Sequence, residues 1–278
     1  METAESGSAR TRHIYGIDFS GAKDAGKKIW IARGSIEGDS LCIEDCRRAS
    51  DLPGSSMYRN DSLSALREII AGAKHSVFGL DFPFGLPGEL VTEHSWEEFI
   101  ERFSTRYLIP KEFRQACHSA FNGSELKRTT DRETHVPFSP YNLRLYPQAY
   151  FGIRDVLAPF VREGRACVLP MQSPLSHLSW VVEICPACTL KRERLYTSYK
   201  GTSREHRTAR EHILAAIVAT GLLRIPDQDL RSRIVMDPGG DALDSVIAAF
   251  ATSRSLTRMT DGYTGKQLPY LLEGFIFV

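Results

Sequence analysis

Two short apolar segments that each end in an aspartate constrain the fold of this chain more than any other feature. The segment 16–19 reads Gly-Ile-Asp-Phe, the segment 79–82 reads Gly-Leu-Asp-Phe, and a glycine or proline follows each acid within three residues. These patterns predict buried strands that stop just after Asp18 and Asp81. Open α/β sheets carry ligand-binding and catalytic groups beyond the carboxyl ends of their strands, so we expect both carboxylates at one sheet edge. Capping of neighbouring turns is the alternative role for either acid.

A second pair of acids opens a helix near the end of the chain. The apolar run 242–250 follows two glycines and predicts a buried helix with Asp241 and Asp244 in its first turn. Residues three apart share a helix face, with Cβ atoms roughly 5–6 Å apart. Two bare carboxylates at that spacing repel, and a divalent cation beside them makes the arrangement favourable. Either acid could instead complement the helix dipole or cap the helix.

The order of the predicted elements indicates an α/β protein. Three strands come first, and the Gly- and Lys-rich connection 21–28 between the first two is typical of a hairpin. A helix with a capping residue then leads to the strand that ends at Asp81. We expect an antiparallel meander closed by a parallel strand, with strands at 13–19, 28–34 and 40–46, a helix at 61–70 and a strand at 76–81.

The remaining chain divides into a helical insertion and a second part of the core. Residues 84–165 are expected to form the insertion, which is either a substrate-covering cap or a structural elaboration. Residues 1–12 are expected to be a disordered tail before a single domain of residues 13–278. Within the insertion we predict helices at 96–103, 110–121 and 147–162 and a long polar loop at 123–140; beyond it, a strand at 178–186, helices at 203–221 and from 241, and a last strand at 270–278.

The composition is that of an ordinary globular protein, with 42% hydrophobic and 25% charged residues. A net charge of +1 gives no overall attraction to nucleic acid or membrane, although a local groove can still be basic. No apolar run reaches the roughly 18–20 residues of a membrane span, and the chain starts without the apolar core of a secretory signal. We therefore expect a cytoplasmic protein with no membrane contact; the sequence does not indicate its oligomeric state.

Six cysteines in 278 residues are too few for a disulfide scaffold. Cys42 and Cys46 could combine with Cys185 and Cys188 in a four-thiolate zinc site, because both spacings fall within the usual range. Buried free cysteines that pack as small hydrophobic side chains are the better interpretation.

Five motifs occur in a fixed order along the chain. They are Gly-Ile-Asp-Phe-Ser-Gly at 16–21, Gly-Leu-Asp-Phe-Pro-Phe-Gly-Leu-Pro at 79–87, Glu-Ile-Cys-Pro-Ala at 183–187, Tyr-Lys at 199–200 and Asp-Ala-Leu-Asp at 241–244. Together they resemble domain of unknown function 429, a family of predicted nucleases with an RNase H-like fold. The resemblance extends from about residue 13 to the end of the chain, and the ordered set is more specific than any single motif.

The resemblance implies an RNase H-like core, a mixed sheet of about five strands flanked by helices. Within that superfamily the arrangement is most similar to Holliday-junction resolvases, in which acids end the first and fourth strands and two more begin the last helix. Asp18, Asp81, Asp241 and Asp244 match those positions and would bind Mg²⁺ or Mn²⁺, with Asp18 bridging two ions. Such ions, roughly 3.5–4 Å apart, activate water and stabilise the leaving oxygen in phosphodiester hydrolysis, and they prefer oxygen ligands.

Two further residues complete the candidate catalytic set. Glu183 lies on a predicted buried strand, where an acid needs a partner. It is either a further metal ligand or general base, or an ion-pair partner of Lys191, Lys200 or Arg207. Lys200 lies in a loop before a helix, where it could contact a substrate phosphate; a solvated surface lysine is the alternative.

The leading hypothesis is therefore a metal-dependent nuclease or phosphodiesterase that acts on nucleic acid or a small phosphate ester. The neutral net charge favours a short substrate. One alternative is an actin-like or kinase-like nucleotide-binding protein, since those proteins share this core and the segment 18–23 resembles their first phosphate-binding hairpin; a second copy of the fold, which they carry, is not found. The other alternative is a non-catalytic module that binds a partner through the insertion.

Overall fold

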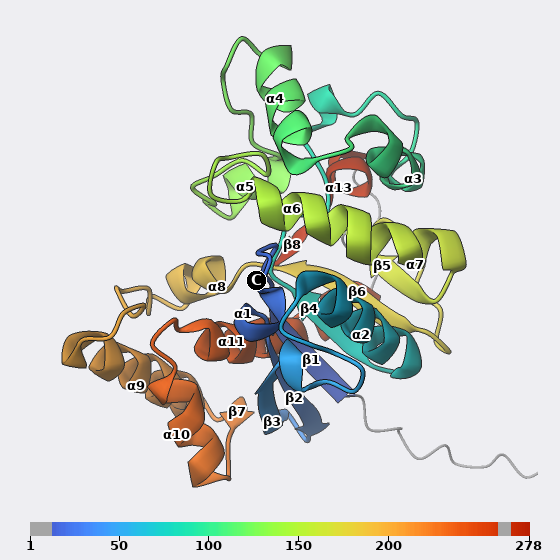
Figure 1. The fold of residues 1–278 in the computed structure, drawn as a ribbon. Coiled ribbons are helices and arrows are strands. Elements are labelled where there is room, and N and C mark those ends of the chain that lie inside the picture. The colour runs from blue at the N-terminus through green and yellow to red at the C-terminus, as the bar shows by residue number, and fades with distance from the viewer. Residues whose placement is uncertain (1–12, 261–267) are drawn as a thin grey trace, which may run out of the picture.

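A computed structural model describes residues 13–260 and 268–278; the predicted tail at 1–12 lies outside these residues. The described chain forms a mixed sheet of eight strands with helices packed against it (Figure 1). The α/β class is confirmed, whereas the expected number of about five strands is wrong. The strands are β1 (His13–Asp18), β2 (Trp30–Glu37), β3 (Ser40–Arg48), β4 (Val77–Leu80), β5 (Ala166–Leu169), β6 (Ser179–Ile184), β7 (Leu223–Arg224) and β8 (Ile276–Phe277).

The sheet combines an antiparallel meander with parallel strands on both sides of it. Its order is β5-β6-β4-β1-β2-β3-β7, and β8 pairs with β6. β1, β2 and β3 pair antiparallel, and β4 lies parallel to β1, as predicted. The strands that were not predicted are β5 and β7, which have four and two residues. Segments this short carry too little periodicity to be recognised in a sequence.

Helices connect several of the strands. The predicted helices at 61–70 and 203–221 are confirmed as α2 and α9, and the connection between β1 and β2 contains a short helix, α1, in place of a simple hairpin turn. The helices outside the insertion are α1 (Ala25–Lys28), η1 (Ala49–Asp51), α2 (Arg59–Gly72), α8 (Pro186–Arg192), α9 (Arg204–Ala219), α10 (Gln228–Met236), α11 (Asp241–Arg254), α12 (Leu256–Thr260) and α13 (Leu268–Glu273).

The segment between β4 and β5 is mostly helical, and its helices lie together at one end of the sheet (Figure 1). The three helices predicted there are confirmed, the last one as a continuous run of two α-helical parts around a π-helical turn. The predicted loop at 123–140 contains an additional short helix, α5. The elements are η2 (Gly88–Leu90), α3 (Trp96–Arg106), α4 (Pro110–Ala120), α5 (Thr129–Glu133), α6 (Tyr146–Gly152), η3 (Ile153–Leu157) and α7 (Ala158–Glu163).

Two hydrophobic cores cover the two faces of the sheet. Neighbouring strand residues point to opposite faces, so Phe78 joins the core formed with α2 and the insertion, while Val77 joins the core formed with α9, α10 and α11. The predicted last strand at 270–278 is wrong for most of its length, because 268–273 is helical and only Ile276 and Phe277 pair with β6. None of the helices in the described part of the chain combines the length and apolar character that a bilayer span requires.

Glycines on β1 and β4 let helix α11 lie directly on the sheet. A Cβ at Gly16 would be 2.1 Å from the backbone nitrogen of Ala249, and one at Gly79 would be 2.0 Å from Oγ1 of Thr252. No side chain larger than hydrogen fits at such a distance. Each glycine lies two or fewer residues before the end of its strand, so the close packing also draws the start of α11 toward the strand ends.

Candidate metal centre

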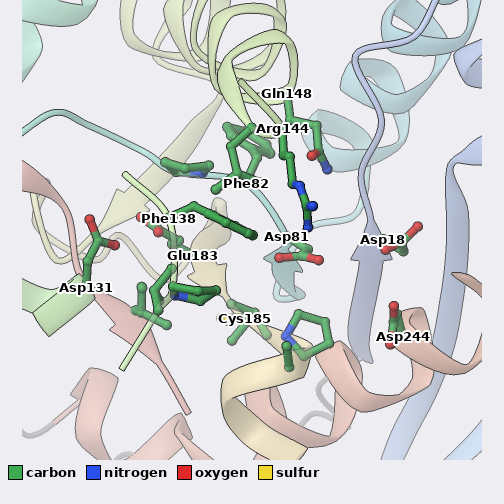
Figure 2. A pocket seen from close by; sticks show the side chains of 18 of the residues that line it. Asp18, Asp81, Phe82, Asp131, Phe138, Arg144, Gln148, Glu183, Cys185 and Asp244 are labelled. Carbon is green, nitrogen blue, oxygen red and sulfur yellow. The ribbon is translucent and has the colours of Figure 1, made fainter. Parts of the chain in front are cut away.

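The carboxyl ends of β1 and β4 place two acids side by side. The strands are parallel neighbours with Ile17 opposite Leu80, and the backbone N–H of Asp81 donates to the carbonyl of Ile17 at 3.0 Å. Asp18 is the last residue of β1 and Asp81 follows β4 directly. Both side chains therefore emerge at the same sheet edge, as the sequence predicted (Figure 2).

The first turn of α11 supplies the second pair of acids, and neither caps the helix. Gly240 is the N-cap residue, with a left-handed φ of 75°, and Asp237 performs the capping. Its Oδ2 accepts hydrogen bonds from the backbone N–H groups of Asp241 at 2.8 Å and of Ala242 at 3.2 Å. Because Asp237 satisfies these donors, the carboxylates of Asp241 and Asp244 are left to face the strand ends.

Three of the four predicted ligands come together. One carboxylate oxygen from each of Asp18, Asp241 and Asp244 lies within 4.8 Å of the other two. Asp81 is outside this group of three but lines the same cleft as Asp18 and Asp244. Oxygen-only donors of this kind suit Mg²⁺ and Mn²⁺, which bind through a few carboxylates and retain several waters. The donor set therefore fits a hard divalent cation.

The clustered acids hold protons more tightly than isolated carboxyl groups. Burial, followed by the repulsion of Asp244, raises the pKa of Asp81 to about 8. The same two causes raise the pKa of Asp18 well above its ordinary value. Burial also raises the pKa of Asp244, although Lys200 opposes the shift. Carboxylates that share a buried site take up protons because they cannot all remain charged, and a bound cation would remove that need.

Lys200 provides a positive charge within the acid cluster. Its Nζ lies 2.6 Å from Oδ2 of Asp244 and 3.2 Å from Oδ1 of Asp241. Burial lowers the pKa of Lys200, but the carboxylates of Asp244 and Asp18 outweigh this effect and raise the pKa overall. Tyr199 next to it donates its hydroxyl to Oδ1 of Asp244 at 2.6 Å. The cluster thus already attracts one cationic group, which shows that its carboxylates are arranged to hold positive charge.

Glu183 lies at the sheet edge but is bound by a partner that the sequence did not indicate. Its two oxygens accept hydrogen bonds from Nη1 and Nη2 of Arg128 at 2.8 and 2.5 Å, and Oε2 also accepts from the backbone N–H of Phe84 at 2.9 Å. Burial raises the pKa of Glu183, and Arg128 opposes the shift. The predicted partners Lys191, Lys200 and Arg207 are wrong.

The role of Glu183 follows from these contacts. The side chain is 2% exposed, and a bidentate arginine pair uses the lone pairs that a metal would need. Arg128 also pairs with Asp131 through Nη2 and Oδ1 at 2.7 Å, so the three residues join the insertion to the end of β6. In this arrangement Glu183 joins the insertion to β6, and both of its oxygens are occupied by donors other than a metal.

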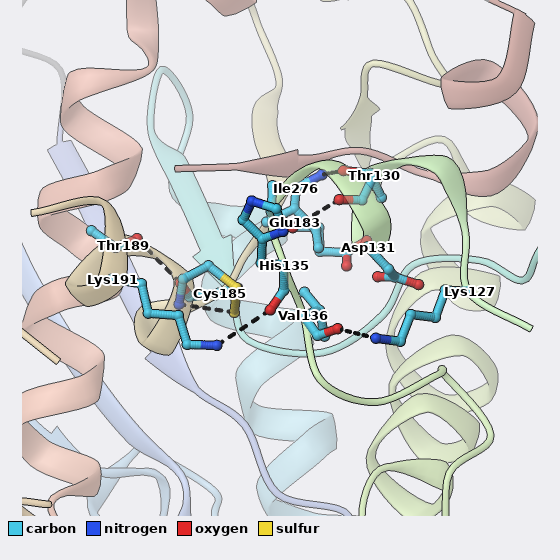
Figure 3. The surroundings of a disulfide bond; sticks show 12 residues. Lys127, Thr130, Asp131, His135, Val136, Glu183, Cys185, Thr189, Lys191 and Ile276 are labelled. Atoms are coloured by element: carbon cyan, nitrogen blue, oxygen red, sulfur yellow. Dashed lines mark hydrogen bonds between the residues drawn. A yellow bond between two sulfur atoms is a disulfide. The ribbon is translucent and has the colours of Figure 1, made fainter. Parts of the chain in front are cut away.

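The cysteines do not form the four-thiolate zinc site. Cys185 and Cys188 are joined to each other by a disulfide at the start of α8 (Figure 3). Their interpretation as free cysteines is therefore wrong, and it is confirmed for Cys42 and Cys46, which are buried and free. Within residues 13–260 and 268–278, the one cluster of potential metal-binding side chains is the group of three aspartates.

A cleft of about 550 Å³ opens above the acids, between the core and the insertion (Figure 2). The core side carries Asp18, Asp81, Asp244 and Lys200, and the insertion side carries Phe138, Arg144 and Gln148. The insertion is fixed over the site by Gln148, whose Nε2 donates to the carbonyl of Phe19 at 2.6 Å. The volume of the cleft lies within the range of roughly 300–1,000 Å³ that small-ligand sites occupy.

Sequence reasoning missed three residues that shape this site. Arg128 and Asp131 lie in the segment that was predicted as a loop, where an arginine followed three residues later by an aspartate is the only local signal of a helix start. Asp237 precedes two glycines and gave no sign that it, and not Asp241, caps α11.

No family model matches this chain, and neither a curated protein nor a solved structure shows significant similarity to it.

Proposed function

We propose that this protein is a metal-dependent phosphodiesterase or nuclease whose centre is formed by Asp18, Asp241 and Asp244, with Asp81 completing it. The observation that carries the proposal is the approach of three carboxylate oxygens from two distant segments to within 4.8 Å of one another. Structural acids are normally paired with cations or backbone donors. Here four acids lie near a single cation, Lys200, so the negative charge of the site exceeds the positive charge that balances it.

The residues of the chain have distinct parts in the proposed reaction. Mg²⁺ or Mn²⁺, when bound, would supply an activated water and a stabilising charge at the leaving oxygen. Asp18 and Asp244, both buried, would hold their oxygens in fixed positions, and the hydroxyl of Tyr199 orients Asp244. Lys200, which lies on the cleft side of the same acids, would turn to a phosphate oxygen once a metal takes its place beside Asp244. The insertion forms the opposite wall of the cleft above the centre, through Phe138, Arg144 and Gln148.

The kinase-like alternative has less support from the geometry. The loop after Asp18 packs against the insertion, since a Cβ at Gly21 would lie 2.4 Å from the carbonyl oxygen of Pro147. Nη1 of Arg59 also donates to the carbonyl of Gly21 at 3.0 Å. In this loop the glycine serves close packing between two parts of the protein, whereas a phosphate-binding hairpin presents its backbone to the ligand.

Hydrolysis of bis(p-nitrophenyl) phosphate, a simple diester, tests the proposal. We expect activity with Mn²⁺ or Mg²⁺ and none with EDTA. Asp18→Asn should lose more than about 100-fold, because even residues that only orient metal ligands typically contribute 10–100-fold. Asp39→Asn is the matched control, since Asp39 is an exposed acid in the turn between β2 and β3. Hydrolysis that survives in the Asp18 variant, or that needs no metal, would refute the proposal; a non-catalytic module would show no hydrolysis at all.

A further inference from the structure

We infer that the insertion side of the cleft is a nucleotide subsite, in which Arg144 binds a phosphate and Phe138 stacks on a base. The substrate of the proposed phosphodiesterase is then a single unpaired nucleotide unit and not a continuous duplex. This inference rests on the proposed function, because the subsite and the metal centre share one cleft.

Arg144 is the side chain of the cleft that is best placed to bind an anion. Its side chain is exposed, reaches from the start of the insertion's last helical run into the cleft, and points toward Asp81 (Figure 2). The other cationic side chains that line the cleft already form ion pairs: Arg128 with Asp131 and Glu183, and Lys200 with the metal-site acids. Among the described residues no carboxylate forms an ion pair with Arg144. A planar guanidinium in that state is suited to bind phosphate through two hydrogen bonds.

Phe138 presents an aromatic ring beside this arginine. The guanidinium carbon of Arg144 lies 5.2 Å from the ring centroid, and the half-buried ring lines the cleft. Tyr196, which is 55% exposed, adds a second ring from the loop after α8. Aromatic side chains next to a cationic one are the usual means by which proteins hold an unpaired base and its phosphate, because every base has a face that can stack.

The loop that carries Phe138 is held from both sides. Nζ of Lys127, in the insertion, donates to the carbonyl of Val136 at 2.8 Å, and Nζ of Lys191, on α8, donates to the carbonyl of His135 at 3.2 Å (Figure 3). The turn before Arg144 is fixed as well, since the backbone N–H of Arg144 donates to Oδ1 of Asn142 at 2.9 Å. Because the backbone that carries both side chains is held in this way, little backbone freedom is lost when a ligand binds.

Size and charge limit what the subsite accepts. A cleft of about 550 Å³ holds a ligand of one or two nucleotides. Affinity for a duplex comes from many phosphate contacts on an extended basic surface, and this protein has a net charge of +1 and one uncommitted cation in the cleft wall. An unpaired nucleotide could come from a small diester or from the end or an extruded base of a nucleic acid chain, and the chemistry of recognition is the same for both.

Binding measured in EDTA tests the subsite without catalysis. A thymidine dinucleotide, a short single-stranded DNA, the matching duplex and bis(p-nitrophenyl) phosphate are titrated by calorimetry. Phe138→Leu should weaken binding of the dinucleotide about 5- to 100-fold, while Phe138→Tyr should retain it. Arg144→Gln should weaken it about tenfold or more. The controls are Tyr58→Leu and Arg102→Gln, which change exposed side chains that do not line the cleft.

The outcomes separate the subsite from the proposed function. Tighter binding of the dinucleotide than of the single strand supports a small diester substrate, and the reverse order supports a chain end; either result supports the subsite. Duplex binding as tight as that of the single strand, or dinucleotide binding that is unchanged in both Phe138→Leu and Arg144→Gln, would overturn it. Metal-dependent hydrolysis of bis(p-nitrophenyl) phosphate would remain intact in that case. Nucleotide binding without any hydrolysis would overturn the proposed function alone.

Discussion

Arg128 is the side chain whose removal should cost this fold the most stability. It is 1% exposed, and all five of its N–H groups have acceptors. Nε and Nη2 donate to Asp131 at 3.0 and 2.7 Å, Nη1 and Nη2 donate to Glu183 at 2.8 and 2.5 Å, and Nη1 also donates to the carbonyl of Glu273 at 3.2 Å. The three segments that meet at this guanidinium are the insertion, the end of β6 and the C-terminal segment.

Replacement of Arg128 by methionine keeps the length of the aliphatic chain and removes the charge. Asp131 and Glu183, which are 1% and 2% exposed, would then face each other as buried acids without a cation. Loss of one partner from a buried ion pair costs about 3–5 kcal/mol. Unfolding entropy of about 2.1 cal/mol/K per residue amounts to about 0.6 kcal/mol/K for 278 residues, so the melting temperature should fall by about 5–9 °C.

Calorimetric melts of the wild type and three variants test this reasoning. The triple variant Arg128→Met, Asp131→Asn, Glu183→Gln should regain most of the lost stability, because neutral side chains no longer need a counter-charge. Arg132→Met is the control, since Arg132 is exposed and its guanidinium binds the carbonyl of Lys127 and the hydroxyl of Thr129. A single variant that melts within about 1 °C of the wild type, or a triple variant no better than the single one, would refute the account of the triad.

Other contacts lead to equally specific expectations. The raised pKa of Asp81, about 8, means that the folded protein keeps a proton which the unfolded chain loses near pH 3.9; this stabilisation is complete below about pH 4 and is lost as the pH rises to about 8. Asp81→Asn should therefore gain melting temperature relative to the wild type between pH 5 and pH 8 in EDTA, and a constant difference would contradict the shift. Gly16→Ala should cost more than about 3 kcal/mol in urea titrations, because its Cβ would meet the backbone of α11 at 2.1 Å, whereas Gly72→Ala meets open space and should be neutral or slightly stabilising. Burial raises the pKa of Cys46 and of Cys117 to about 12, so both thiols should react with a thiol reagent only on unfolding, and rapid labelling of the native protein would show that the core opens.

The position of the acid cluster could be predicted because each member is marked by its own segment. Asp18 and Asp81 end or follow apolar runs, and an antiparallel meander followed by a helix implies that β4 lies parallel to β1, with the two strand ends at one edge. Asp244 lies in the first turn of an apolar helix, which predicts burial of its face against the sheet. Local patterns of this kind carry the information about direction and end point that a shared site requires.

The ion-pair partner of Glu183 could not be predicted from local sequence patterns. Its partner Arg128 is 55 positions away in the chain and belongs to a segment with little periodicity. Cations nearer in the sequence, such as Lys191, were the natural candidates, yet Lys191 binds the carbonyl of His135. A pairing between distant segments is decided by tertiary packing, which also creates the two-residue strand β7. Neither feature has a signal within a window of ten or so residues.

The balance of charge at the strand ends connects the acids, the lysine and the shifted pKa values. Four aspartates contribute up to four negative charges, and Lys200, which contacts Asp241 and Asp244, returns one. Protons or a bound cation have to balance the remaining negative charge, because burial leaves little water to screen it. The raised pKa values of Asp18, Asp81 and Asp244 are the first solution. A divalent cation is the second, and it becomes the more favourable one as the pH rises and protons become scarce. A centre used purely for structure would gain nothing from this excess of negative charge, since a second lysine or an arginine would remove it.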